Sequence, residues 1–282
     1  MTREERALVA EDIVSEIRQG YYTNREGEDI DISEYLEYTR SYSGLYPDLL
    51  PPIRSGVVRV VRVARNPGMK VFTENIDTFS KARQYGDSGV CLNMASFSFP
   101  GGGFLSGASA QEESLCRRSS LIASISMFSA LGDKLFDCSR EKKGYPLGMY
   151  GAIYSPKIAV WKDSLGNNFP EPFLTNVISL PAIKNPALDS SGKLKSEVRN
   201  QEKQKIRQIL RVAFYSRGYR FLVLGALGCG AYHTPPEEMA LCFKEVLGEE
   251  EFRVFDEVCF AVLDDKNSGP GGNYSVFKKI LG

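Results

Sequence analysis

Two glycine-rich segments constrain the fold of this chain more than any other feature. The first, residues 93–120, contains three consecutive glycines, and the second, residues 224–240, contains three glycines within six positions. Each segment follows an apolar run typical of a buried strand and precedes a helical pattern. Because ligands of α/β proteins bind at the carboxyl ends of the strands, both segments are expected to border one ligand site.

Strands and helices alternate along most of the chain. The patterns predict strands at 57–63, 70–76, 89–95, 150–154, 173–180, 220–226 and 255–263, and helices at 2–19, 77–84, 111–131, 193–217, 235–247 and 274–281. This alternation favours an α/β fold of three layers, with helices on both faces of a mixed central sheet. Residues 21–52 show no clear period, and we expect them to cover the domain. The prediction is one structural unit, with an N-terminal helical extension (1–55) and a main domain (56–282).

The charge balance excludes a general attraction to polyanions. The 282 residues include 35 basic and 35 acidic side chains. Without net charge the chain has no long-range field that would collect nucleic acid, so we expect no direct sequence-specific nucleic-acid binding. A phosphate-bearing ligand would have to be held by local groups such as backbone amides.

Neither a membrane nor secretion is indicated. The longest apolar runs are only strand-sized, and residues 1–20 are too charged for a secretory signal. The six cysteines are widely spaced and form no CxxC pair, which is typical of reduced, mostly buried thiols. We therefore expect a cytoplasmic protein that binds no membrane.

The residue inventory narrows the chemistry. His233 is the only histidine, so sites built from two or three histidines are excluded, and a histidine-based triad would depend on this residue alone. No group of cysteines and histidines has the spacing of a metal site. Carboxylates are left as the best candidates for acid–base catalysis, and we expect no metal or cofactor.

The first glycine-rich segment carries two candidate carboxylates. Its glycines, Gly101 to Gly103, expose backbone amides and allow close approach to a sugar or phosphate. Seven residues later, Gln111, Glu112 and Glu113 begin a predicted helix. A carboxyl group there could protonate a leaving glycosidic oxygen and then deprotonate water. The alternative is structural, because Ser109 and Glu112 have the spacing of a capping box that would only close the helix.

The second glycine-rich segment has the glycine density of a phosphate-binding loop. It precedes a helix that begins near Pro235, and helix N-termini favour anions. The segment lacks the GK[ST] of a P-loop, and GALGCG fails the dinucleotide pattern GxGxxG. Tyr232 within it has two interpretations, a ring that stacks on or fences a ligand, or a local packing residue.

Taken together, these motifs resemble those of one enzyme family. PGGG, followed after seven residues by QEE, is the signature of poly(ADP-ribose) glycohydrolases, and its setting is similar to the bacterial-type (microbial) branch. The similar segments are LNMAS at 92–96, QEESLCRRS at 111–119, IYSPKIAVWKD at 153–163 and GALGCGAY at 225–232. The resemblance extends from about Val71 to Leu263, and more weakly into the N-terminal helix.

The resemblance implies a macrodomain fold and hydrolysis of the ribose–ribose O-glycosidic bond of poly(ADP-ribose), which releases ADP-ribose. By motif, Glu113 would be the catalytic acid and base, and Glu112 would orient the ribose and the leaving group. The first loop would wrap the diphosphate and distal ribose, the second would bind the diphosphate, and Asp77 would lie beside the adenine. The substrate-binding residues so implied are Asn93, Gly101, Gly102, Gly103, Gln111, Gly228, Cys229, Gly230, Ala231, Tyr232 and Asp77.

Two positions depart from the family. Phe99 stands where the family usually has Asn before PGGG, and Tyr232, where it often has Phe, is followed by His233 and Thr234. These departures bear on ligand affinity and chain-length preference rather than on the QEE residues. The expected partners are poly(ADP-ribose) or ADP-ribosylated proteins. Three alternatives stay open: hydrolysis of mono-ADP-ribosyl linkages on protein or nucleic acid, binding of ADP-ribose without catalysis, and general nucleotide binding.

Overall fold

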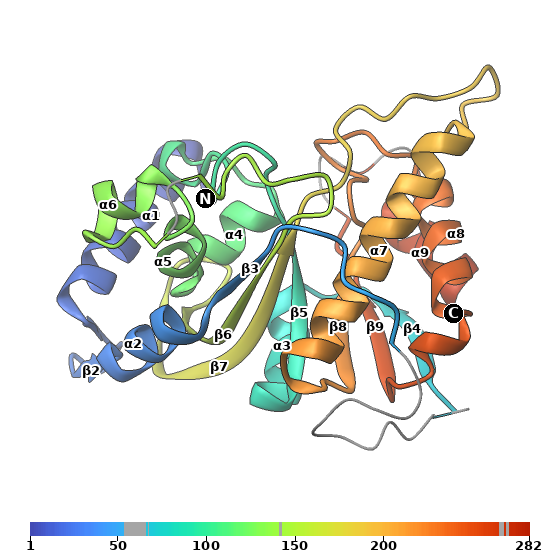
Figure 1. The fold of residues 1–282 in the computed structure, drawn as a ribbon. Coiled ribbons are helices and arrows are strands. Elements are labelled where there is room, and N and C mark those ends of the chain that lie inside the picture. The colour runs from blue at the N-terminus through green and yellow to red at the C-terminus, as the bar shows by residue number, and fades with distance from the viewer. Residues whose placement is uncertain (54–65, 67, 141–142, 265–267, 269–270) are drawn as a thin grey trace.

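A seven-stranded mixed sheet forms the centre of the molecule (Figure 1). The computed structural model describes residues 1–53, 66, 68–140, 143–264, 268 and 271–282. Within them, the sheet has the strand order β3-β6-β7-β5-β8-β9-β4. The five strands from β7 to β4 in this order run parallel, whereas β6 and β3 pair antiparallel. The strands are β3 (Gly44–Tyr46), β4 (Lys70–Glu74), β5 (Gly89–Met94), β6 (Ala152–Lys162), β7 (Asn168–Leu180), β8 (Phe221–Leu224) and β9 (Glu257–Ala261).

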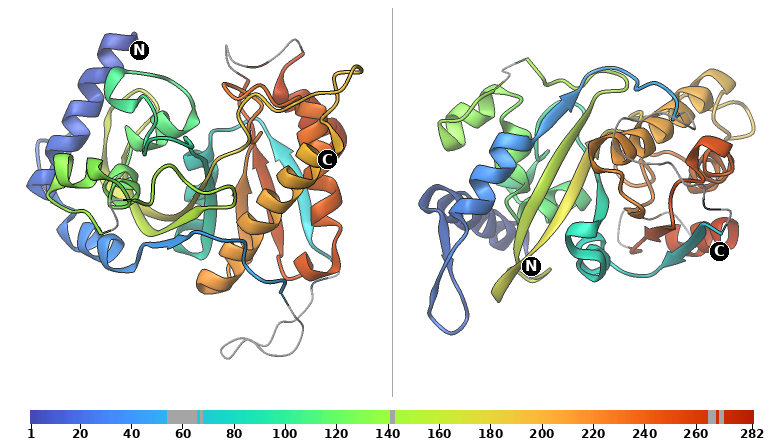
Figure 2. Two further views of the ribbon diagram at one scale, coloured as in Figure 1. Left: turned by 45° about the horizontal axis from the view of Figure 1, so that its top comes forward. Right: turned by 60° about the horizontal axis from the view of Figure 1, so that its bottom comes forward.

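Helices cover both faces of the sheet and make the three layers that the sequence predicts (Figure 2). Along β5, Val90 and Leu92 point into a core that includes α7, α8 and α9, whereas Cys91 points into a second core with α1 to α5. The predicted α/β class with a mixed central sheet is confirmed. The helices are α1 (Arg3–Gln19), α2 (Ser33–Tyr42), α3 (Thr78–Tyr85), α4 (Gln111–Cys116), α5 (Leu121–Ser126), α6 (Ala130–Phe136), α7 (Ser196–Arg217), α8 (Pro236–Leu247) and α9 (Asn273–Leu281).

The N-terminal region contains more regular structure than its sequence indicates. Helix α1 begins with a capping box, in which Thr2 and Glu5 bond reciprocally. Residues 21–52 are not simply a cover, because they form a hairpin of β1 (Tyr21–Thr23) and β2 (Asp29–Asp31), then α2, and then β3 at the edge of the sheet. Each of these strands has three residues, too few for a period to show. The division at residue 55 stays a prediction, and the strand expected at 57–63 lies outside the described residues.

The single helix predicted over 111–131 is wrong. The structure has α4 and α5 there, separated by a turn, and then a third short helix, α6. In the turn, the backbone bonds to β6 instead of continuing the helix: Ser120 N–H donates to the carbonyl of Ala159 (2.9 Å), and Trp161 N–H donates to that of Arg118 (3.0 Å). These tertiary bonds replace the intrahelical ones, and sequence periodicity does not report them.

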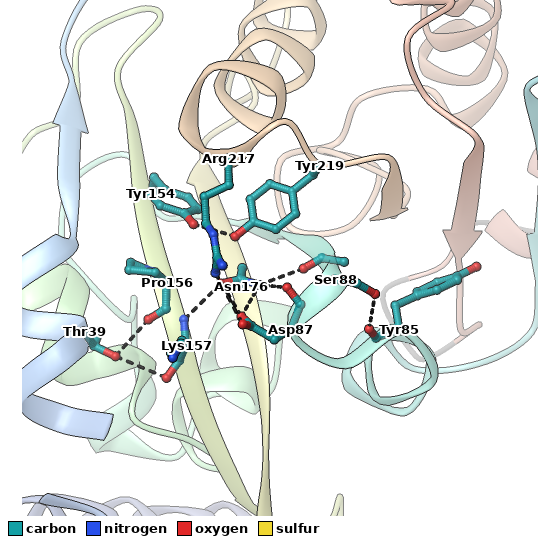
Figure 3. Close-up of polar contacts among 11 residues, drawn as sticks. Thr39, Tyr85, Asp87, Ser88, Tyr154, Pro156, Lys157, Asn176, Arg217 and Tyr219 are labelled. Atoms are coloured by element: carbon teal, nitrogen blue, oxygen red, sulfur yellow. Dashed lines mark hydrogen bonds and ion pairs between the residues drawn. The ribbon is translucent and has the colours of Figure 1, made fainter. Parts of the chain in front are cut away.

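A bulge in β6 is held by Asn176, a buried residue of β7 that pairs with the start of β5 (Figure 3). Lys157 in the bulge has a φ of 48°, and its N–H donates to Oδ1 of Asn176 on β7 (3.0 Å). The amide nitrogen of Asn176 donates to the carbonyls of Gly89 (2.9 Å) and Asp87 (3.1 Å). The bulge therefore lies within β6, which continues past the predicted end at residue 154.

The helices and the cysteines can be compared with the expectations about membranes and thiols. Among the described residues, every helix is either too short or too polar to cross a bilayer. All six cysteines are free thiols, and five of them are buried.

Candidate active site

A cavity of about 1100 Å³ lies at the carboxyl ends of the parallel strands, between the two glycine-rich segments. The first segment contributes Phe97, Phe99, Gly102 and Gly103 to its wall, and the second contributes residues 226–228 and 230–232. Further parts of the wall come from residues that follow β4, β7 and β9, from residues 147–149 before β6, and from Lys205 and Asn273. The two segments thus border one site, as their positions after buried strands predict.

Most of the residues singled out in the sequence line this cavity. They are Asp77, Gly102, Gly103, Gln111, Glu112, Glu113, Gly228, Gly230, Ala231 and Tyr232. The other three, Asn93, Gly101 and Cys229, are buried and do not line it. Asn93 lies directly behind the wall, where its amide nitrogen donates to Oε1 of Glu112 (3.2 Å) and to Oγ of Ser179 (3.0 Å). For Asn93, the structure therefore shows a contact with a glutamate at the cavity wall.

Glu112 is fixed by bonds to the first loop rather than by capping its helix. Helix α4 has Ala110 at its N-cap and no side-chain cap, so the capping box considered for Ser109 and Glu112 does not form. Oε2 of Glu112 instead accepts from the N–H of Ser96 (2.7 Å). The side chain is almost completely buried, and this burial raises the pKa of Glu112 to about 7.

Glu113 has one oxygen held by the loop and one oxygen without a partner. The N–H of Gly103 donates to Oε1 (3.0 Å). Oε2 is buried and has no hydrogen-bond partner among the described residues. Such an unsatisfied carboxyl oxygen at a cavity wall costs free energy unless a ligand or water bonds to it. This pattern is typical of a group that acts on a ligand.

The glycine loop approaches both glutamates closely. A Cβ atom built on Gly102 would lie 2.5 Å from Oε1 of Glu113 and 3.4 Å from Oε2 of Glu112. The φ of Gly102 is +53°, in the region that favours glycine. The loop can therefore take this path only because position 102 has no side chain.

Gln111 ties the start of α4 to the end of β5. Its amide oxygen accepts from the N–H of Met94 (2.9 Å), and its amide nitrogen donates to the carbonyl of Leu92 (2.7 Å) and to Oγ1 of Thr78 (3.1 Å). These bonds engage the amide oxygen and both amide hydrogens. Gln111 thus fixes the position of the two glutamates that follow it.

Asp77 caps α3 and forms an ion pair at the cavity wall. Its carboxylate accepts from the N–H groups of Phe79 and Ser80 (both 3.1 Å) and lies 2.7 Å from Nη1 of Arg118. Burial alone would raise the pKa of Asp77, but the charge of Arg118 and the hydrogen bonds from Ser80 outweigh it, and the pKa is lowered. The side chain is therefore a fixed negative charge at this wall.

Tyr232 connects the two loops across the cavity. Its hydroxyl oxygen accepts from the N–H of Phe97 (2.9 Å), and its own carbonyl accepts from the N–H of Asn185 (2.9 Å). Gly228, with a φ of +75°, packs so closely that a Cβ there would lie 2.7 Å from Cβ of Ala182 and from Oγ1 of Thr234. The second loop thus rests on the segment that follows β7.

A family model for the catalytic domain of microbial-type poly(ADP-ribose) glycohydrolases matches residues 10–163, more than half of the chain. The chain belongs to this family. The enzyme class predicted from the motifs, a glycoside hydrolase, is thereby confirmed. A search of curated proteins gave no match.

Solved structures of poly(ADP-ribose) glycohydrolases are similar over nearly the whole chain. The enzyme from Thermomonospora curvata is 26% identical, with a TM-score of 0.80 over 99% of this chain and 100% of that one. The same enzyme bound to the inhibitor ADP-HPD gives 26% identity and a TM-score of 0.77 over 98% and 99%. The enzyme from Deinococcus radiodurans in complex with ADP-ribose is 28% identical, with a TM-score of 0.61 over 94% of this chain and 96% of that one.

Part of this glycohydrolase cavity was not predicted from the motifs. Residues 147–149, 182–184 and 262–264 line it but carry no signature. Two of these segments lie close behind the carboxyl ends of β7 and β9, so the strand-end rule alone would have located them. Residues 147–149 precede β6 and have no comparable signal. Among the described residues, no group of three or more His, Cys, Asp or Glu side chains is arranged to hold a metal ion.

Proposed function

We propose that this family member hydrolyses the ribose–ribose O-glycosidic bond of poly(ADP-ribose), with Glu113 as general acid and base. The observation that carries this proposal is Oε2 of Glu113, buried at the cavity wall without a partner among the described residues. Because Gly103 holds the other oxygen, the carboxyl group has a defined orientation toward a bound sugar. An oriented carboxyl group with one available oxygen is what proton transfer requires.

The second loop supports binding of a diphosphate. The consecutive N–H groups of Gly230, Ala231 and Tyr232 donate to no acceptor among the described residues, and all three residues line the cavity. Neighbouring free amides of this kind form a concave anion site. In a chain without net charge, these amides supply the local attraction that a diphosphate needs.

The proposed reaction has two steps. Protonated Glu113 gives its proton to the 2′-oxygen of the leaving ribose while the bond from this oxygen to the anomeric carbon breaks and the bonding pair leaves with the oxygen. The anomeric carbon gains oxocarbenium character, which the nearby diphosphate stabilises electrostatically. Water then attacks this carbon and gives a proton back to Glu113, which restores the starting state.

Glu112 supports this reaction by holding the ribose and the loop in place. Its oxygens already accept from Ser96 and Asn93, which fixes the side chain against the end of β5. We assign it the orienting role that the motif implies, with Asn93 as the group that positions it. Asp77 and the adenine remain a proposed pair at the other end of the cavity.

The experiment is release of ADP-ribose from purified poly(ADP-ribose) by the unmodified chain and by Glu113→Gln. General acid–base catalysis is worth about 10²- to 10⁴-fold, so we expect Glu113→Gln to lose activity by about that factor and still bind ADP-ribose. Glu197→Gln is the matched control, because Glu197 is exposed in the first turn of α7.

Preserved turnover by Glu113→Gln would exclude Glu113 as the acid and base. Absence of release by the unmodified chain, with ADP-ribose still bound, would point to a binding protein. Parallel assays with mono-ADP-ribosylated protein separate the polymer from single linkages as the substrate.

A further inference from the structure

A second, smaller cavity of about 220 Å³ lies beside the first. Its wall is built from the start of α1, the region of α4 and the turn between β6 and β7. Three residues, Ser109, Ser114 and Arg118, line both cavities. The two cavities are therefore neighbours on either side of the first turns of α4, the helix that carries Glu112 and Glu113.

Positive charge dominates this small cavity. Arg6 and Arg117 both line it, and neither lies within ion-pair distance of a carboxylate of any described residue. Arg118 also lines it but is paired with Asp77. Asp163 is the acidic residue among the described lining residues. Its carboxylate forms an ion pair with Arg25 (3.1 Å) and accepts from the N–H groups of Leu165 and Asn167. We call this space the arginine cavity.

Arg117 is the unusual member of this group. Only 3% of it is exposed, yet among the described residues its guanidinium makes one hydrogen bond, from Nη1 to the carbonyl of Ala108 (2.6 Å). Burial lowers the pKa of Arg117, the carboxylate of Glu113 opposes this, and the charge of Arg6 adds to it. Two guanidinium groups near each other cost free energy, and the buried one, Arg117, has no carboxylate of a described residue within ion-pair distance to offset this cost.

Two hydroxyl groups complete the wall. The side chains of Ser109 and Ser114 line the cavity and have no hydrogen-bond partner among the described residues. Arginine guanidinium groups and serine hydroxyls are the donors that phosphate oxygens prefer in proteins. An anion with several oxygens would satisfy the hydroxyls and compensate the charge of Arg117 at once.

We propose that the arginine cavity binds a phosphate group of the ADP-ribose unit on the far side of the scissile bond. This inference rests on the proposed function, which places the terminal unit in the large cavity and the bond at Glu113. The next unit of the polymer must then leave the large cavity near α4, and it carries a diphosphate. The arginine cavity would thus let the enzyme distinguish a polymer from a single ADP-ribosyl group.

The test compares binding of a two-unit fragment of poly(ADP-ribose) with binding of ADP-ribose, by calorimetry. All measurements use the Glu113→Gln background, so that the fragment is not cleaved. Arg6→Gln and Arg117→Gln each remove one positive charge from the arginine cavity, and Ser114→Ala removes one hydroxyl donor. Arg253→Gln is the control, because Arg253 is exposed directly after the turn Glu250–Phe252 and the substitution makes the same change of charge.

We expect each of the two arginine variants to lower the affinity for the two-unit fragment about tenfold or more. This is the effect of losing a charge-assisted hydrogen bond. Ser114→Ala should lower the affinity for the fragment by a smaller factor. Because Arg6 and Arg117 also bond to the carbonyls of Gly107 and Ala108 in the first loop, the decisive result is a loss of affinity that is larger for the fragment than for ADP-ribose. The control should change neither affinity. A titration with inorganic phosphate shows whether a free anion competes with the fragment.

Equal losses for the fragment and for ADP-ribose would overturn the proposal, because they would show that the arginines only support the loop. An unchanged affinity for the fragment would overturn it too, and if inorganic phosphate still bound, the cavity would be a site for free anions. The proposed function is tested separately, by the activity assay: it fails if the unmodified chain releases no ADP-ribose. The binding assay therefore tests the arginine cavity alone.

Discussion

Gly102 is the residue at which the first loop meets both glutamates. We expect Gly102→Ala to lower kcat/KM by about 10²-fold or more, since displacement of a reacting group by about 1 Å has an effect of that size. The added methyl would lie 2.5 Å from Oε1 of Glu113 and would push either the loop or the carboxyl group away. Steady-state kinetics on poly(ADP-ribose) measure this loss.

Gly192→Ala separates crowding from backbone strain. Gly192 has a φ of +78°, also in the left-handed region, but a Cβ there would have no neighbour within 4 Å. This variant should lose about 1–2 kcal/mol of stability and keep its activity. Equal kinetic losses in the two variants would show that the contact with Glu113 is not the cause.

Glu112 should make the stability of the protein depend on pH. Burial raises its pKa from 4.5 to about 7, so the folded chain binds more protons than the unfolded chain between these values. Its contribution to stability is therefore complete below about pH 4.5 and is lost as the pH rises through 7. Glutamine does not titrate, so Glu112→Gln should not show this loss. We expect the difference in unfolding free energy, variant minus unmodified chain, to increase by up to about 3 kcal/mol between pH 5 and pH 8.

Urea unfolding at several pH values measures this difference. Glu202 has a pKa raised to about 7 by burial as well, so the unmodified chain alone does not isolate Glu112. The comparison with Glu112→Gln cancels the contribution of Glu202, and Glu197→Gln serves as the exposed control. A difference that does not change with pH would mean that Glu112 stays in one charge state.

At the scale of single elements, local patterns predicted what depends on neighbours in sequence. The buried runs before each glycine-rich segment correctly indicated β5 and β8, and the amphipathic pattern at 193–217 indicated α7. The break between α4 and α5 was missed because it is caused by β6, about 40 residues away in the chain, whose backbone bonds to residues 118 and 120.

In the candidate site, too, the sequence predicted local features but not contacts between separate segments. The motifs located the glutamates and both loops, but the bonds from Asn93 to Glu112 and from Phe97 N–H to the hydroxyl of Tyr232 join residues of different segments. Gln111 lies next to the glutamates in the motif, yet its amide is bonded entirely to protein. Spacing finds the residues of a motif, and packing decides which of them present free atoms to a ligand.

At the scale of the whole molecule, Trp161 reports whether the N-terminal region unfolds with the rest. This only tryptophan is fully buried on β6, its indole N–H donates to Glu16 of α1 (2.7 Å), and its ring stacks on Tyr22 (centroids 5.9 Å apart). We expect tryptophan fluorescence and far-UV circular dichroism to give the same urea midpoint, because a single unit unfolds in one transition. An earlier change in fluorescence would show that residues 1–55 detach first.

The first turn of α1 packs on the loop that precedes the two glutamates. Arg3 Nε donates to the carbonyl of Ser106 (2.8 Å) and Arg6 Nε to that of Gly107 (2.7 Å), while a Cβ on Gly107 would lie only 2.0 Å from the carbonyl oxygen of Arg3. For protein engineering, this makes the two ends of the chain unequal. A purification tag or fluorescent fusion at Met1 would lie next to the helix turn that bonds to the first glycine-rich loop, whereas one placed after Gly282 would follow α9.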